Sequence, residues 1–515
     1  MKISRWMALA APLALIAAGC MVGPDYHRPA TTMPSEFAAA IPTTQAATLP
    51  TTAAAQPVDI TRWWASLNDP ELNSLVERAV ASNPDLQIAL MRLQQARAVE
   101  FAANGGAFPV LELDAGAARG TGTNSIKGRV PGPLNAGTNT TGYSEITEVA
   151  GFDAIWEADL FGGLRRGVEA ARYDTQAAME ARNAVLISLI SDVARAYIDE
   201  RVAQMQLAIA TSQVSSEQQV SDLVQERFKR GFTNELDPAL AQRELAEQQA
   251  DVAPIKAAIL QAQRRISVLV GAFPDDLNAE LQTPGALPQL PAQIDPGLPV
   301  ELLRRRPDIR QAERQLASAT ARIGVATDAL YPHLLITGGA GLQGQGLGRT
   351  PLKAQFDGSI GPAFYWPLLD FGTLDALVER QDYRTREALL NYRRTILAAV
   401  EEVNNAISNY SAQSQRLAGL NDALTAAQRA MQIATQRYNG GFTNFLDVLD
   451  AERELYALQD QYTAAQEAVV IQYIALYKAL GGGWEAYQSV PSIRRPQPAI
   501  IAIFHATTQP SDTSR

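Results

Sequence analysis

The sequence predicts a mainly α-helical chain built from two similar halves, each of which also contributes a pair of β-strands. Three observations support this fold class: an internal repeat, two very long stretches with heptad periodicity, and short stretches in which apolar and polar residues alternate. The chain has 515 residues, of which 19% are charged and 7% aromatic. This composition suits long helices better than a close-packed enzyme core.

Composition also argues against several classes of function. With one cysteine, the chain has no intramolecular disulfide framework and no multi-cysteine metal site. Its three scattered histidines argue against a histidine metal site or a catalytic triad. The net charge of −10 does not favour a nucleic-acid partner. Since the chain also lacks a clustered catalytic constellation, we expect no enzyme activity and no cofactor.

The N-terminus has the pattern of a bacterial lipoprotein signal. Residues 1–19 combine a basic start with a short apolar stretch and end in two alanines and a glycine before Cys20. We expect Cys20 to become the acylated first residue, anchored in outer-membrane lipid, because the following Met21 is not the aspartate that suggests inner-membrane retention. The alternative is an ordinary buried thiol after a generic signal.

The rest of the chain divides by composition and by an internal duplication. The predicted divisions are a lipidated segment and low-complexity linker over 20–60, a first repeat over 61–285, a second repeat over 286–490 and a flexible tail over 491–515.

The duplication rests on motifs that recur at nearly constant spacing. Asn83-Pro84-Asp85 recurs as Arg306-Pro307-Asp308, and Trp156 recurs as Trp366. The offset changes from 223 to 210 between these pairs, which places an insertion in the first copy. A tetrapeptide is repeated identically as Gly231-Phe232-Thr233-Asn234 and Gly441-Phe442-Thr443-Asn444.

Each half contains one stretch that predicts an exceptionally long helix. Residues 164–230 and 374–438 contain no proline and would each form a helix of about 100 Å. The second stretch has an unbroken apolar heptad seam, and the first has two breaks at Glu200 and Ser221. The shorter helices are expected at 84–103, 236–270, 306–330 and 446–480.

A second seam in each long helix begins apolar and becomes polar, as in Ser414 and Asn421. This pattern suits helices packed side by side in a wall with one wet face. The alternative is an elongated coiled coil with a poor core.

The strand regions have a period of two. Leu111 and Leu113 alternate with Glu112 and Asp114, and similar alternation recurs around Phe152–Leu160 and Ile360–Leu368. Strands with an apolar outer face and a polar inner face are typical of transmembrane β-barrels, although a half-buried soluble sheet would also fit. The joining segments, about 119–142 and 343–355, are expected to be exposed loops.

Four strands per chain cannot close a barrel alone, because a bilayer tolerates no open sheet edge. Three chains would give twelve strands, which predicts a trimer, whereas two chains would give a narrower eight-stranded barrel.

Taken together, the chain resembles the TolC-type outer-membrane factor family. The resemblance rests on the lipidated cysteine, the following segment Val22–Pro29, and the duplicated halves with their tip motif. It implies a homotrimer with a twelve-stranded outer-membrane barrel and a coiled-coil cylinder that extends into the periplasm. The implied partners are a periplasmic adaptor (membrane fusion) protein and an inner-membrane transporter of the resistance–nodulation–division (RND) class. The implied function is a passive exit duct for efflux.

The tip of the second long helix carries the candidate gate. Glycines permit the chain reversal, after which Asp447 and Asp450 share one helical face. Threefold symmetry would turn these aspartates into two carboxylate rings, and the resemblance assigns them and Tyr438 to a closed periplasmic entrance. The alternative is that the aspartates only complement the helix dipole. Thr443 replaces a basic residue found in some relatives, which predicts a different closing pattern.

The repeated tetrapeptides are expected to form the two tip turns and to dock the adaptor. In the first copy, Pro238 and Leu240 follow Asp237 where the second copy has Val448 and Asp450, which predicts either a structural role or an adaptor contact for that tip. Two other functions stay open at this point: a duct for type I protein secretion, and a non-conducting structural coiled-coil lipoprotein.

Overall fold

The computed structural model describes residues 21–31, 33–38, 59–121, 144–291, 299–347 and 353–488. The predicted signal peptide, Cys20, the C-terminal tail from 491 and nearly all of the low-complexity segment lie outside the described residues. The helices are η1 (Ile60–Leu67), α2 (Pro70–Ser82), α3 (Pro84–Gly105), α4 (Gly163–Lys229), α5 (Leu236–Leu269), α6 (Pro299–Arg305), α7 (Pro307–Asp328), α8 (Thr373–Asn439), α9 (Phe445–Ala479) and η3 (Glu485–Tyr487). The strands are β1 (Val110–Thr121), β2 (Ser144–Ala158), β3 (His333–Leu347) and β4 (Lys353–Tyr365).

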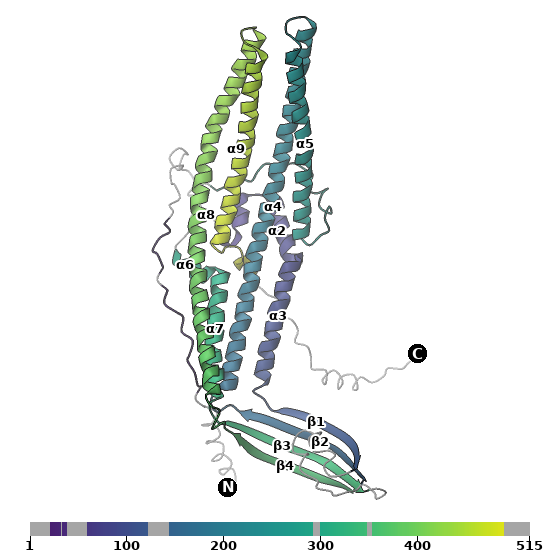
Figure 1. Ribbon diagram of the computed structural model, residues 1–515, viewed down its shortest axis with the longest axis vertical. Coiled ribbons are helices and arrows are strands. Elements are labelled where there is room, and N and C mark those ends of the chain that lie inside the picture. Colours follow the sequence, from purple (N-terminus) through teal and green to yellow (C-terminus); the bar gives the residue numbers. More distant parts are fainter. Residues whose placement is uncertain are drawn as a thin grey trace, which may run out of the picture.

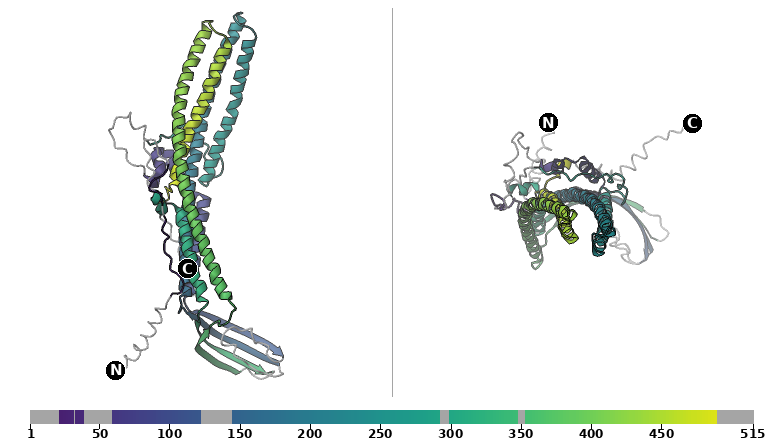
Figure 2. Two further views of the ribbon diagram at one scale, coloured as in Figure 1. Left: turned by 60° about the vertical axis from the view of Figure 1, so that its left-hand side comes forward. Right: turned by 90° about the horizontal axis from the view of Figure 1, so that it is seen from above.

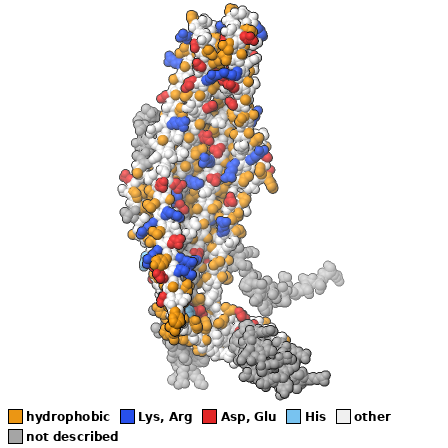
Figure 3. All heavy atoms as spheres, in the orientation of Figure 1, with side chains coloured by type: hydrophobic (Ala, Val, Ile, Leu, Met, Phe, Trp, Pro, Cys, Tyr) orange, Lys and Arg blue, Asp and Glu red, His pale blue; other side chains and the backbone are white. Residues whose placement is uncertain are grey.

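The molecule is an elongated helical stalk with a small sheet at one end (Figure 1). The hairpins α4/α5 and α8/α9 reach the far end of the stalk, where both chain reversals lie. Seen end-on, the long helices form a curved wall (Figure 2). On the face drawn in Figure 3, acidic, basic and hydrophobic side chains are interspersed along the stalk. No helix among the described residues is long and apolar enough to cross a membrane.

The two long helices were predicted to within one residue at each end, at 67 residues apiece. The heptad seam of α8 packs inward, since Ile396, Val403 and Tyr438 are buried. In α4 the predicted break at Glu200 is also fully buried, where its carboxylate accepts hydrogen bonds from Gln204 and Gln263. The two amides serve one carboxylate oxygen, and the other has no hydrogen-bond partner among the described residues, so the seam buries this acid with only half of its carboxylate hydrogen-bonded.

The duplication has a structural counterpart where the strands meet the helices. The indole N–H of Trp156 donates to the carbonyl of Ala107 at 3.0 Å, and that of Trp366 donates to the carbonyl of Leu330 at 3.1 Å. Trp156 and Trp366 are equivalent at the repeat offset of 210, and Ala107 and Leu330 are equivalent at the offset of 223. The same hydrogen bond therefore forms in both halves. The insertion in the first copy thus leaves the junction unchanged.

The sheet is antiparallel in the order β1-β2-β3-β4. Its register places Leu113 opposite Phe152, Ala154 opposite Gly338, and Gly338 opposite Ile360, so that one face is apolar. The opposite face carries Glu112 and Asp114 of β1 and Asp153 and Glu157 of β2. The predicted alternation of the two faces is confirmed.

The predicted joining segment 343–355 was wrong at both ends. Strand β3 continues to Leu347 and β4 begins at Lys353, with Gln343 paired opposite Gln355. Glycine and glutamine dominate this stretch, so it shows no apolar alternation. A backbone ladder needs no such side-chain pattern, because its hydrogen bonds are made by main-chain groups. For the same reason β1 extends to Thr121, into the other predicted joining segment.

The segment after the predicted lipidation site lies against the helices. The Val22 N–H donates to the carbonyl of Phe161 at 2.9 Å, and the Arg166 guanidinium donates to the Val22 carbonyl and, at 2.7 Å, to Asp25. Arg166 is buried, and a Cβ at the adjacent Gly324 would lie 2.8 Å from the Val22 carbonyl oxygen. The segment named in the resemblance therefore docks into a site shaped for it.

Candidate functional site

The two hairpin tips have the same backbone geometry. Gly231 and Gly441 have φ values of 77° and 74°, a conformation that favours glycine. In each tip the phenylalanine after this glycine donates its N–H to a carbonyl five residues earlier, at 2.9 Å. This pattern closes the last turn of a helix as a Schellman-type cap. The phenylalanines, Phe232 and Phe442, are 72% and 80% exposed and project from the tips.

The returning helix α9 begins at an asparagine cap, whereas α5 begins after Glu235, whose side chain makes no capping hydrogen bond. The Asn444 side-chain oxygen accepts from the Asp447 N–H at 3.1 Å, and that of Asn234 accepts from the Leu236 N–H at 2.9 Å. Asn444 is therefore the N-cap of α9. In the first copy, the Thr233 hydroxyl donates to Asp237.

Tyr438 lies where the two tips pack together. Its ring is 5% exposed and lies 5.5 Å from the Phe445 ring, between centroids. The Arg227 guanidinium of the first tip lies over the Tyr438 ring at 4.5 Å, a cation–π contact. Burial raises the pKa of Tyr438, and its hydroxyl has no hydrogen-bond partner among the described residues. Tyr438 of α8 belongs to a buried apolar cluster with Val224 of α4, Ala241 of α5, and Phe445, Val448 and Leu449 of α9.

Asp447 and Asp450 lie on the opposite, exposed side of the first turns of α9. Neither carboxylate forms an ion pair within the described part of the chain. Their neighbours Val448 and Leu449 are buried in the tip cluster, so the helix turns the two aspartates away from it. The pair is therefore free to face solvent or other molecules.

Sequence reasoning missed a buried carboxylate cluster below the tips. Glu217 of α4 is fully buried and both its carboxylate oxygens lack a hydrogen-bond donor among the described residues. Glu452 of α9 is 2% exposed and accepts from the Tyr456 hydroxyl at 2.8 Å. Burial and the neighbouring Glu452 raise the pKa of Glu217. Glu244 of α5, also buried, is paired with Arg453 at 3.0 Å.

The internal repeat points to only one member of this cluster, Glu244. The motif around Glu244 recurs in the second half, but its counterpart there is the exposed Glu454. Glu217 matches Ala427 in the second copy, so the repeat conceals it. Only packing of α4 against α5 and α9 brings the three acids together.

Comparison with known proteins identifies the family. The profile described as "Outer membrane efflux protein" matches residues 75–272 and 298–482. The chain belongs to the outer membrane efflux protein family. It is therefore a non-enzymatic transport protein of the outer membrane, as the sequence indicated. The two matched segments lie on either side of the α5–α6 connection.

Relatives of this efflux protein have diverse names. It is 31% identical over 439 residues to the pyoverdine export outer membrane protein OpmQ of Pseudomonas aeruginosa, covering 83% of this chain and 88% of the relative. It is 28% identical over 476 residues to the cation efflux system protein CusC of Escherichia coli K12, covering 92% and 98%. Among solved structures, the outer-membrane channel OprN matches with a TM-score of 0.78 and 34% identity, covering 90% of this chain and all of that one.

Proposed function

We propose that this chain is the outer-membrane exit duct of a tripartite efflux pump, gated at its periplasmic helix tips. The observation that carries the proposal is the four-stranded sheet, whose apolar face is exposed at one end of a long helical wall. Phe152, Phe356 and Ile360 on that face are 52%, 69% and 85% exposed. Such a face suits contact with lipid, because burying apolar surface is favourable.

The open edges of the sheet support assembly with other copies. Within the described residues, β1 pairs only with β2, and β4 only with β3, so both outer strands have an unpaired edge. Because unpaired backbone groups are costly inside a bilayer, the edges would pair with those of neighbouring chains. Three copies give a twelve-stranded barrel, and the curved helical walls would then close into a periplasmic cylinder.

The partners follow from this architecture. A duct without an energy-coupling motif depends on an inner-membrane transporter, here proposed to be of the RND class, joined through a periplasmic adaptor. The adaptor would dock on the exposed tip turns around Phe232 and Phe442. Acylated Cys20 would hold the assembly to outer-membrane lipid. OpmQ and CusC are named for pyoverdine and for cations, so the shared fold does not itself select the cargo.

One experiment tests the assembly and the conductance. The purified protein should be trimeric in detergent by mass measurement, and should form ion-conducting pores in planar bilayers. Its resting conductance should be low if the proposed tip gate is closed at rest. A monomer without conductance would overturn the proposal, and a conducting dimer would replace the twelve-stranded barrel with an eight-stranded one.

A second experiment tests the gate. We expect Asp447→Ala combined with Asp450→Ala to abolish block by divalent cations, because the exposed carboxylates would form the entrance rings. Asp422→Ala, which removes an exposed carboxylate of α8 away from the tip, is the matched control. If cation block is unchanged in the double variant, the carboxylate-ring idea fails while the duct itself stands.

A further inference from the structure

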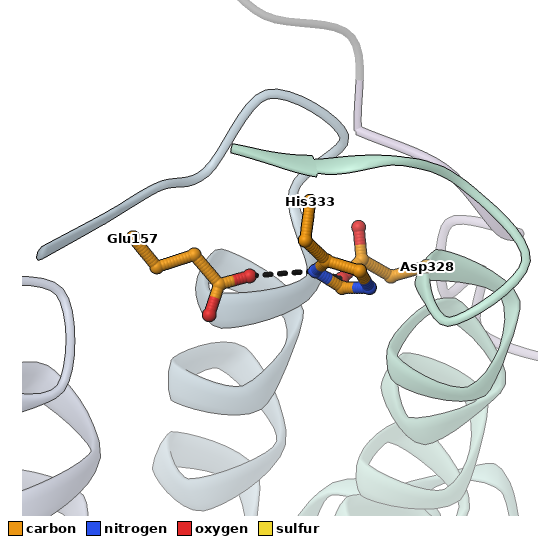
Figure 4. Close-up of side chains that lie close together, drawn as sticks. All are labelled: Glu157, Asp328 and His333. Carbon is orange, nitrogen blue, oxygen red and sulfur yellow. Dashed lines mark hydrogen bonds and ion pairs between the residues drawn. The ribbon is translucent and has the colours of Figure 1, made fainter. Parts of the chain in front are cut away.

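Three side chains from separate elements converge where the sheet meets the helices (Figure 4). Glu157 lies at the end of β2, Asp328 ends α7, and His333 begins β3. The His333 Nδ1 atom lies 2.7 Å from Glu157 Oε1 and 4.0 Å from Asp328 Oδ2. One nitrogen or oxygen atom from each residue lies within 4.8 Å of the others.

The repeat shows that the fold does not require this cluster. By the two offsets of the duplication, Glu157 corresponds to Pro367, Asp328 to Gly105, and His333 to Val110. The equivalent junction in the other half is therefore built without any of these polar groups.

The surroundings hold the side chains in place and leave a path for entry. The register sets His333 and Glu157 on the same, polar face of the sheet. A Cβ on Gly163, the first residue of α4, would lie 1.9 Å from Asp328 Oδ2, so this glycine leaves room for the carboxylate. The exposed fractions of the Glu157, His333 and Asp328 side chains are 31%, 25% and 14%, so the cluster is sheltered but open to solvent.

We propose that Glu157, Asp328 and His333 form a binding site for a divalent transition-metal ion of the Zn²⁺ type. One imidazole nitrogen and two carboxylate oxygens are typical Zn²⁺ ligands, and water can complete the set. In a tetrahedral site with bonds of about 2 Å, ligand atoms lie about 3.3 Å apart. The two separations from His333 Nδ1, 2.7 and 4.0 Å, lie on either side of this value, so small side-chain movements complete the geometry. The absence of a thiolate or thioether from the three residues disfavours soft monovalent ions.

A bound ion would cross-link the sheet to α7. Glu157 and His333 belong to adjacent strands, whereas Asp328 belongs to the helix that leads into β3. Binding to the folded state alone raises stability by mass action. The site thus differs from the proposed tip gate in both place and readout.

The test measures zinc binding by the full-length protein in detergent after removal of bound metal with a chelator. Titration calorimetry with zinc chloride should show one saturable site per protomer. His333→Ala should weaken binding at least about tenfold. Zinc should also raise the unfolding temperature of the wild-type protein, and this rise should be lost in the variant. His27→Ala is the matched control, because His27 is exposed and lies outside the cluster.

Glu157→Gln guards against loss of fold, since it keeps the shape of the side chain while removing its charge. It should weaken zinc binding and retain the wild-type circular dichroism spectrum. The proposal is overturned if the wild-type protein shows no saturable zinc binding. It is also overturned if His333→Ala and Glu157→Gln bind zinc as the wild type does. The contact between His333 and Glu157 would then be an ion pair and not part of a metal site. Neither result depends on whether the protein conducts ions.

Discussion

Tyr438 shows how much one side chain contributes at the tips. Its ring joins the two hairpins through Phe445 and Arg227, whereas its buried hydroxyl has no hydrogen-bond partner among the described residues. The resemblance assigned this tyrosine to a closing network. The structure adds that its described contacts are made through the ring.

This division of roles gives a prediction for two substitutions. Tyr438→Ala should destabilise the tip by about 3–5 kcal/mol, because it leaves a cavity in the cluster. Tyr438→Phe should be nearly neutral, because it removes a buried hydroxyl without a partner. Hydrogen exchange of backbone amides around 438–449 measures both. Equal loss of protection in the two variants would show that the hydroxyl, rather than the ring, holds the tips together.

At the level of helix packing, two buried carboxylates lie next to each other below the helix tips. Glu217 and Glu452 lie close together on α4 and α9, and burial raises the pKa of Glu217. Because the folded-state pKa lies above the unfolded value, at pH above the ordinary value of 4.5 the folded chain keeps a proton on Glu217 that the unfolded chain has lost. Stability therefore falls with rising pH until the folded-state pKa is reached.

We expect Glu217→Gln to stabilise the protein and to flatten this pH dependence. The neutral amide removes the cost of ionising a buried carboxyl beside Glu452. Unfolding temperatures measured between pH 5 and 9 check the prediction, with the gain largest at the alkaline end. The exposed Glu454→Gln serves as the control and should leave the profile unchanged. A variant less stable than wild type across the range would contradict the argument.

The elements themselves could be read from the sequence where periodicity was strong. Heptads located α4 and α8, and alternation located the two faces of the sheet. The end of β3 and the start of β4 were not predicted, because the glycines and glutamines there show no apolar alternation. The division of the chain at residue 285 and the lipidation of Cys20 stay predictions.

At the scale of the whole molecule, the apolar face of the sheet is the feature most open to test. Ile360 and Ser359 are adjacent in β4 and point to opposite faces. If the apolar face contacts lipid, Ile360→Arg should cost about 2–4 kcal/mol near the bilayer centre. Ser359→Arg, which places the same charge on the polar face, is the matched control.

The expected result is loss of membrane-inserted trimer for Ile360→Arg and normal amounts for Ser359→Arg. Electrophoresis of unheated outer-membrane fractions measures the assembled form. Similar trimer levels in the two variants would contradict a lipid-facing role for this surface.

Repeats, heptads and alternation can be recognised along the chain, so the sequence predicted the helical halves, the strand faces and the family. Contacts between distant residues became known only from the folded structure. Glu217, Glu244 and Glu452 come from three helices, and His333 meets Glu157 across 176 residues. No sequence period records such contacts, because they depend on how helices and strands pack after each has formed. The scattered positions of the three histidines along the chain argue against a metal site, and only the folded structure places His333 beside acidic groups. In space, this histidine lies between two carboxylates.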